Sequence, residues 1–164
     1  MRQATIERKT KETQIRISFH ADGKGKSDIR TGIGFFDHML HSFARHGFFD
    51  LQIQIDGDLE VDGHHTVEDC GIVLGKAIDK ALLDKVGINR YGSCLLPMDD
   101  ALVLCALDLC GRPYLGYNFE FPTQTIGNLD TQLIREFFYA LSYSAGMNLH
   151  IKVLDGHNSH HLAE

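Results

Sequence analysis

The sequence has no tryptophan, only three prolines and no apolar stretch long enough to cross a bilayer. Its longest segment without Asp, Glu, Lys or Arg covers residues 137–151, which is shorter than the roughly 20 residues of a membrane helix and is interrupted by polar side chains. The first residues are charged throughout and lack the apolar region of a secretory signal. We therefore expect no membrane helix and a cytoplasmic location.

Positive charge is also scarce. The chain has 16 Lys and Arg residues against 22 Asp and Glu residues, a formal net charge of -6, and no predicted helix carries a basic stripe. Nucleic acid is therefore an unfavourable partner. The sequence has no CxxC pair either, and we expect reduced thiols in the core at the four cysteines, Cys70, Cys94, Cys105 and Cys110. A chain of 164 residues can bury roughly 70% of its unfolded surface in one domain.

Hydrophobic periodicity predicts alternating strands and helices. Apolar and polar residues alternate in three half-buried strands, at 15–19, 51–55 and 149–153. The apolar run 101–109 predicts a central strand that turns at 111–113 into a partner strand over 114–121. Apolar residues spaced i, i+3, i+4 and i+7 predict three helices, at 35–43, 67–82 and 130–145. We expect an α/β (α+β) fold with helices packed on one face of the sheets.

A repeat divides the chain into two similar halves. The motif HHxxE occurs twice, from His64 to Glu68 and from His160 to Glu164, each time after a helix, a strand and a turn. We expect a single domain made of two repeats, about 1–88 and 89–164. A helix of roughly four turns follows the first motif. At the second motif the sequence stops, so we expect a C-terminally truncated chain that lacks an amphipathic helix covering half of the sheet.

The HHxxE spacing is typical of a metal site. The first His and the Glu lie one helical turn apart and can hold one ion, whereas the second His, His65 or His161, is rotated by about 100° and should serve another ion. His38 and His150 are further candidate ligands, and His46 is a weaker one. Imidazole ligands alone favour zinc, iron or nickel over manganese. An octahedral ion with four protein ligands keeps two positions for substrate or water.

Several other charged residues are either candidate site residues or ordinary surface charges. Arg90 and Arg112 lie in glycine-rich turns, where a guanidinium can bind a phosphate or carboxylate, but solvated turn arginines are equally common. Glu12 is interpreted, from its spacing alone, as a surface charge before the first strand. Asp99 and Asp100 form either a paired-carboxylate site or a charged turn.

The ordered series of motifs resembles the imidazoleglycerol-phosphate dehydratases over essentially the whole chain. The motifs are TKET at 10–13, TGIGFFDHML at 31–40, RHG at 45–47, GDLEVDGHHTVEDCGIVLG at 57–75, GINRYG at 87–92, PMDD at 97–100, DLCGRP at 108–113 and GHNSHHLAE at 156–164. The resemblance implies a ribosomal protein S5 domain 2-like fold with internal duplication. It also implies a lyase that dehydrates imidazole glycerol phosphate to imidazole acetol phosphate in histidine biosynthesis.

The resemblance further implies a site with two Mn2+ ions that bind the substrate imidazolate. The implied metal ligands are His38, His64, His65, Glu68, His150, His160, His161 and Glu164. The implied substrate contacts are Glu12, His46, Arg90, Arg112 and Ser159. Proton transfer would involve Glu12 and an HHxxE carboxylate (Glu68 or Glu164) or His38, without a single assignment. The family assembles as trimers joined into 24 subunits with shared active sites, and for a truncated chain the alternative is assembly into trimers only.

Two other functions compete with this interpretation. A metal-dependent hydrolase is disfavoured because the sequence lacks HExxH and carries two equivalent motifs. A metal-storage or cage-forming protein would need the histidines but not Arg90, Arg112 or Glu12.

Overall fold

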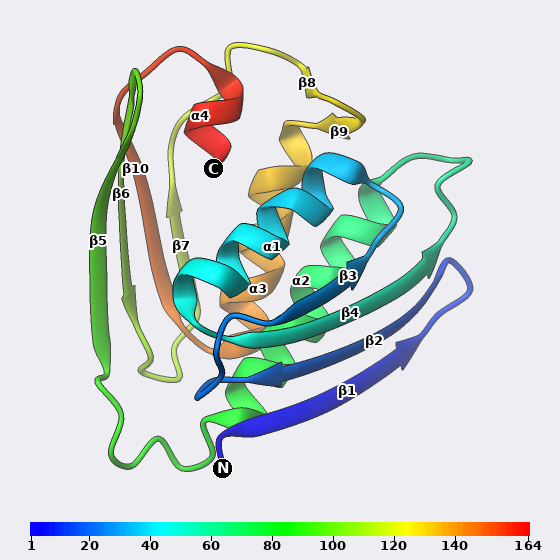
Figure 1. Cartoon of the computed structure of the whole chain (residues 1–164), viewed down its shortest axis with the longest axis vertical. Coiled ribbons are helices and arrows are strands. Elements are labelled where there is room, and N and C mark those ends of the chain that lie inside the picture. Colours follow the sequence, from blue (N-terminus) through cyan, green and yellow to red (C-terminus); the bar gives the residue numbers. More distant parts are fainter.

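The computed structural model describes all 164 residues as two four-stranded sheets with three long helices between them (Figure 1). The first sheet contains β1 Gln3–Lys9, β2 Thr13–His20, β3 Ser27–Arg30 and β4 Asp50–Gly57. The second contains β5 Tyr91–Met98, β6 Ala101–Asp108, β7 Tyr114–Tyr117 and β10 Asn148–Asp155. The helices are α1 Gly34–Gly47, α2 His64–Ala81, α3 Gln132–Ala145 and α4 Ser159–Ala163. A small hairpin pairs β8 Thr125–Ile126 with β9 Leu129–Asp130.

Both large sheets have the same topology. Their strand orders are β1-β2-β4-β3 and β5-β6-β10-β7. In each order the first two pairs of neighbouring strands are antiparallel and the last pair is parallel. Both halves of the chain also have the same order of elements: two strands, a short strand, a helix, a strand and a helix with the HH pair in its first turn. Only β8 and β9 interrupt the second series. The predicted duplicated α/β architecture is therefore confirmed.

One predicted strand pairing is wrong. The apolar run 101–109 forms β6, but its neighbours are β5 and β10 rather than the strand that follows the turn. β7 ends at Tyr117 and pairs in parallel with β10. A parallel pair requires a long crossover. Here α3 supplies that crossover, so the partner of β7 comes about thirty residues later in the chain.

The core lies between the first sheet and the helices. β2 turns Ile15, Ile17 and Phe19 inward, and the alternation predicted for this strand follows from that one-sided burial. α2 is buried along most of its length and packs directly on α3. Two glycines make this approach possible, because a Cβ atom on Gly71 would lie 2.6 Å from the carbonyl oxygen of Phe137 and one on Gly75 would lie 2.7 Å from that of Leu141.

The second sheet is less completely covered. β5 is an edge strand whose residues are nearly all exposed, and Leu96 on its inward face is 60% exposed. This exposure corrects the expectation of four core thiols. Only Cys70 on α2 is buried, whereas Cys94 on β5 is exposed and Cys105 and Cys110 are half-buried. None of the helices is long and apolar enough to cross a membrane.

Candidate metal centres and substrate contacts

The first group of predicted ligands lies where α4 meets α1. His160 and Glu164 share one side of α4, and His38 reaches toward them from α1. The Nε2 atoms of His160 and His38 lie 3.0 Å and 3.5 Å from Oε2 of Glu164. One ligand atom from each residue lies within 4.8 Å of the other two. These three residues form the His38 cluster, which joins the two halves of the chain.

The orientation of α4 is fixed by side chains, because a helix of five residues has few hydrogen bonds of its own. The side-chain oxygen of Asn158 accepts hydrogen bonds from the backbone N–H groups of His160 and His161, at 2.9 Å and 3.3 Å. Ser159 is buried, and its hydroxyl oxygen accepts hydrogen bonds from the backbone N–H and the hydroxyl of Thr123, at 3.2 Å and 2.8 Å. Ser159, predicted to contact substrate, thus holds α4 in place.

The second group lies at the N-terminal end of α2. Nε2 of His64 is 3.6 Å from Oε2 of Glu68, one turn further along the helix. His65 turns away from this pair, and its Nδ1 atom lies 3.1 Å and 2.9 Å from the two carboxylate oxygens of Asp58. Asp58 raises the pKa of His65, and the charges of Glu12 and Asp62 add to this effect. We call His64, His65 and Glu68 the His64 cluster.

Glu12 lies beside this cluster because the β1–β2 turn is tied to it. The backbone N–H of Asp58 donates to the carbonyl oxygen of Glu12 at 3.1 Å. The hydroxyl of Thr13 donates to Oδ2 of the buried Asp69 on α2 at 2.5 Å, and Arg8 on β1 forms an ion pair with the same carboxylate. These contacts bring Glu12, which sequence spacing alone did not distinguish from a surface charge, close enough for its charge to raise the pKa of His65.

His161 has an arrangement that matches that of His65. Its Nδ1 atom lies 2.7 Å from Oδ1 of Asp100, in the turn between β5 and β6. Oδ2 of Asp100 accepts hydrogen bonds from the backbone N–H groups of His157 and Asn158, at 2.7 Å and 3.0 Å. The hydrogen bond from His161 lowers the pKa of Asp100 most, and the two backbone hydrogen bonds lower it further. On the other side of the ring, Nε2 of His161 lies 3.5 Å from Oδ2 of Asp99.

The donor atoms of both clusters fit a divalent transition metal. The His38 cluster offers two imidazole nitrogens and one carboxylate oxygen. In the His64 cluster, His64 and Glu68 face each other and offer one imidazole nitrogen and one carboxylate oxygen. The side chains of His38 and His160 are 49% and 46% exposed, so an ion held between them would remain accessible from outside. Three protein ligands leave octahedral positions for further ligands.

The predicted phosphate-binding arginines lie elsewhere, at one end of the second sheet, with Arg90 just before β5 and Arg112 beside the start of β10. Arg90 donates from Nε and Nη2 to the two carboxylate oxygens of Asp108, at 2.7 Å and 3.0 Å, and its guanidinium lies 4.9 Å from the centre of the Tyr91 ring. The Asp108 carboxylate raises the pKa of Arg90, and Arg90 lowers that of Asp108. Arg112 is exposed, and its guanidinium forms no ion pair.

His150 lies near the same end of the second sheet. Its ring centre is 5.3 Å from that of Tyr114 on the neighbouring strand. A Cβ atom on Gly116, its direct cross-strand partner, would lie 2.4 Å from Nδ1 of His150. The glycine therefore leaves room for the imidazole ring.

A single chain does not bring these groups together. β10 begins at Asn148, whose side-chain amide donates to the backbone carbonyl of Arg112 at 2.6 Å. The strand ends just before α4 (Figure 1), and its eight residues span about 23 Å. Arg90, Arg112 and His150 thus lie at the opposite end of the second sheet from the His38 cluster. His46 follows His38 by eight residues on α1, about 12 Å along the helix axis, and is exposed.

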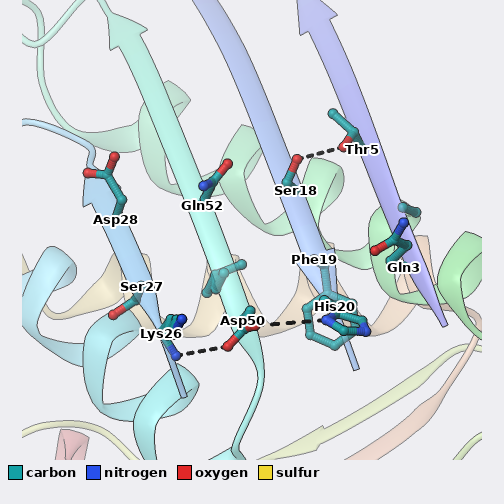
Figure 2. A pocket seen from close by; sticks show the side chains of 12 residues that line it. Gln3, Thr5, Ser18, Phe19, His20, Lys26, Ser27, Asp28, Asp50 and Gln52 are labelled. Carbon is teal, nitrogen blue, oxygen red and sulfur yellow. Dashed lines mark hydrogen bonds and ion pairs between the residues drawn. The ribbon is translucent and has the colours of Figure 1, made fainter. Parts of the chain in front are cut away.

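A hollow lined by twelve residues of the first sheet contains none of the predicted site residues. It lies on the solvent side of the first sheet, where Figure 2 shows polar side chains from all four strands. His20 and Asp50 face each other across it, with Nδ1 of His20 3.8 Å from Oδ2 of Asp50. The clusters described above are better candidates for chemistry because each combines two imidazoles with a carboxylate, the side chains that bind a transition metal.

Three contributing residues were not predicted to be part of the site from the sequence: Asp58, Asp108 and Asn158 each hold a predicted site residue in place. Asp100, for which the sequence left a paired-carboxylate site and a charged turn open, lies in the β5–β6 turn and holds His161. Asn158 had a detectable signal, because Asn two residues before an expected helical histidine is typical of an N-cap. Asp100 pairs with a histidine 61 positions away, and only the tertiary fold brings the two residues together.

Comparison with known proteins gives consistent results. The family model for imidazoleglycerol-phosphate dehydratase matches residues 31–164. The imidazoleglycerol-phosphate dehydratase of Lachnoclostridium phytofermentans is 63% identical over 163 residues, which cover 99% of this chain and 83% of that protein. The protein of the same name from Roseobacter denitrificans is 60% identical and is matched over 100% of this chain and 84% of its own length.

Solved structures are similar over almost the whole chain. The crystal structure of imidazoleglycerol-phosphate dehydratase from Staphylococcus aureus superposes with a TM-score of 0.88 at 37% identity, over 98% of this chain and 89% of that one. The Pyrococcus furiosus structure, in complex with (S)-C348, gives a TM-score of 0.79 at 34% identity, over 96% of this chain and 84% of that one.

Proposed function

The chain belongs to the imidazoleglycerol-phosphate dehydratase family, and on that premise we propose that it removes water from imidazole glycerol phosphate at sites completed between copies of the chain. Family membership makes it an enzyme, a hydro-lyase of histidine biosynthesis. The product of the proposed reaction is imidazole acetol phosphate.

The separation of the site residues supports a shared site. The His38 and His64 clusters lie on different elements, and the two arginines and His150 lie at the far end of the second sheet. A phosphorylated imidazole is far too short to span about 20 Å within one chain. Copies arranged so that the arginine end of one faces a cluster of another would complete the site. We propose a homo-oligomer for this reason, and the resemblance to the family adds the proposal that its trimers assemble into 24 subunits.

The proposed metal ligands are the residues whose side chains already converge. His38, His160 and Glu164 would hold one ion, and His64 with Glu68 would hold the other. His65, His161 and His150 would bind ions shared with neighbouring copies, because none of them faces a complete cluster in its own chain. Manganese bound there would supply Lewis-acid stabilisation for negative charge on the substrate imidazole.

The remaining residues bind phosphate and move protons. A guanidinium can bind a phosphate through two parallel hydrogen bonds, and Arg112 is free to do so. Arg90 is oriented by Asp108 and would add positive charge. Dehydration takes a proton from carbon and gives one to the departing hydroxyl, so it needs a base and an acid. Glu12 would serve in one of these roles, and Glu68, Glu164 or His38 in the other.

The test is to mix two inactive variants of the full chain. Glu68→Gln damages the His64 cluster, and Arg112→Ala damages the opposite end of the molecule. If each site takes these residues from different copies, a randomly mixed oligomer contains some sites with both native residues, and about a quarter of wild-type activity returns. Mixing Glu68→Gln with His64→Gln is the control, because both changes affect one cluster and no activity should return. Failure of the first mixture to recover any activity contradicts the shared site.

A further inference from the structure

The two histidines of each HHxxE motif have different partners in this structure. The first, His64 or His160, directs Nε2 toward the glutamate of its own motif, at 3.6 Å and 3.0 Å. The second, His65 or His161, directs Nδ1 toward an aspartate outside the motif, at 2.9 Å and 2.7 Å. The same division occurs in both halves of the chain, with Asp58 in one and Asp100 in the other.

We propose that Asp58 and Asp100 are positioning residues that hold the ring proton of His65 and His161 on Nδ1 and so keep Nε2 of each ring free to bind a divalent metal. The inference rests on the proposed metal sites. It adds two carboxylates that bind no metal themselves but fix the tautomer and the direction of the two outward ligands.

The chemistry follows from what each group can donate. An ionised carboxylate accepts hydrogen bonds and donates none, so the nitrogen within hydrogen-bond distance of it carries the proton. In His161 this nitrogen is Nδ1, 2.7 Å from Asp100, because Nε2 lies 3.5 Å from the largely exposed carboxylate of Asp99. In a neutral imidazole the other nitrogen then has the lone pair. Metal-binding histidines commonly donate their second ring N–H to a carboxylate in this way, which orients the ring and raises the basicity of the ligand.

The two aspartates are themselves held in place. The backbone N–H of Asp58 donates to Glu12, and its carbonyl oxygen accepts from Val61, so the loop before α2 is fixed on both sides. Asp100 connects the β5–β6 turn to the two residues that precede α4. The Asp58 side chain is only 19% exposed, whereas the ring of His65 is 45% exposed. The carboxylate is therefore shielded while the imidazole remains open to a metal.

The variant Asp58→Ala tests the inference at the simpler of the two positions. Two measurements on the full chain are needed: the 15N chemical shifts of the histidine rings in the metal-free protein, and the Mn2+ affinity by titration calorimetry. In the wild type we expect the proton of His65 on Nδ1. In the variant we expect the proton to move toward Nε2 and the Mn2+ affinity to fall by about 10- to 100-fold.

Two controls separate positioning from a general structural effect. Asp56→Ala removes a carboxylate two residues away, on the solvent face of β4, and should change neither measurement. The ring of His161 in Asp58→Ala should keep its Nδ1 proton because its partner is Asp100. The melting temperature of the metal-free variant should remain close to that of the wild type, since Asp58 uses its side chain only for His65.

The outcomes distinguish a failure of the positioning role from a failure of the proposed metal sites. If the wild type binds Mn2+ and Asp58→Ala binds it equally well, or if the His65 tautomer does not change, the positioning role is wrong and the proposed metal sites stand. If the wild type binds no Mn2+, the metal part of the proposed function fails together with this inference. The corresponding variant Asp100→Ala should shift the tautomer of His161 and leave that of His65 unchanged.

Discussion

Asp50, at the start of β4, shows how a single carboxylate can make the stability of a loop depend on pH. Its Oδ1 accepts hydrogen bonds from the backbone N–H groups of Lys24 and Lys26, at 2.8 Å and 3.0 Å, and these bonds lower the pKa of the carboxyl group. A group with a lowered folded-state pKa stabilises the fold above its unfolded pKa, about 3.9 for Asp, and this contribution is lost as the pH falls through the folded value.

We therefore expect Asp50→Asn to lower the melting temperature at about pH 7, and its effect to shrink progressively as the pH falls below about 3.9, the unfolded value. Thermal unfolding followed by circular dichroism over this range measures the difference. Asp56→Asn is the matched control, because Asp56 is exposed and accepts no hydrogen bond in the structure. A difference between wild type and Asp50→Asn that stays constant with pH would contradict the role of the charge.

The four thiols should react at very different rates. Cys94 is exposed, whereas burial raises the pKa of the Cys70 thiol well above its ordinary value. Since the thiolate is the reactive form, we expect a chromogenic disulfide reagent to modify Cys94 first and Cys70 only after unfolding. Cys94→Ser should remove the fastest phase of the reaction. If that phase survives in Cys94→Ser, the exposure of β5 described above is wrong.

At the scale of the elements, the contact between α2 and α3 depends on two small residues. A Cβ atom on Gly75 would lie 2.7 Å from both the carbonyl oxygen of Leu141 and the Cβ of Ser144, and neither helix can yield without moving its backbone. We expect Gly75→Ala to reduce the free energy of unfolding by about 1–3 kcal/mol through overpacking. Chemical denaturation monitors the change.

Lys76→Ala is the control for the glycine variant. Lys76 is adjacent on the same helix and exposed, so its replacement tests helix propensity without the interhelical contact. It should leave the stability within about 0.5 kcal/mol of wild type. Equal stability of Gly75→Ala and wild type would show that the helices can separate slightly at no cost.

The elements differ in how well their sequences reveal them. The three long helices could be predicted because each has one buried face, which imposes a 3.6-residue period. β1 is an edge strand whose inward positions include Arg8 beside Ala4 and Ile6, so its alternation is weak. In β5 the adjacent Leu95 and Leu96, followed by Pro97, obscure the two-residue period. The pairing of β7 with β10 depends on a crossover that no local pattern encodes.

The site could be predicted only in part for the same reason. The two HHxxE motifs are local, and their helical spacing shows which histidine shares a face with the glutamate. The meeting of His38 with α4 and of Asp100 with His161 requires the two halves to be packed together. Periodicity contains no information on such contacts between distant parts of the chain.

At the scale of the whole molecule, metal and assembly should be coupled. If ligands from different copies share ions, we expect the particle to grow on addition of Mn2+ and to become smaller again with a chelator. Analytical ultracentrifugation of the full chain measures this. His65→Gln, which removes a ligand proposed to be shared between copies, should prevent growth, whereas Glu7→Gln, on the solvent face of β1, should not. A size that is independent of Mn2+ in the wild type would contradict ligation across subunits.

The contact between α2 and α3 also has a consequence during synthesis on the ribosome. α2 ends at Ala81, but α3, which covers its glycine face, ends at Ala145, 64 residues later (145 − 81). At the usual 5–20 residues per second, this face of the nascent chain stays uncovered for roughly 3 to 13 seconds. The first half can therefore form its sheet early, while its most closely packed seam depends on a segment that has yet to be translated.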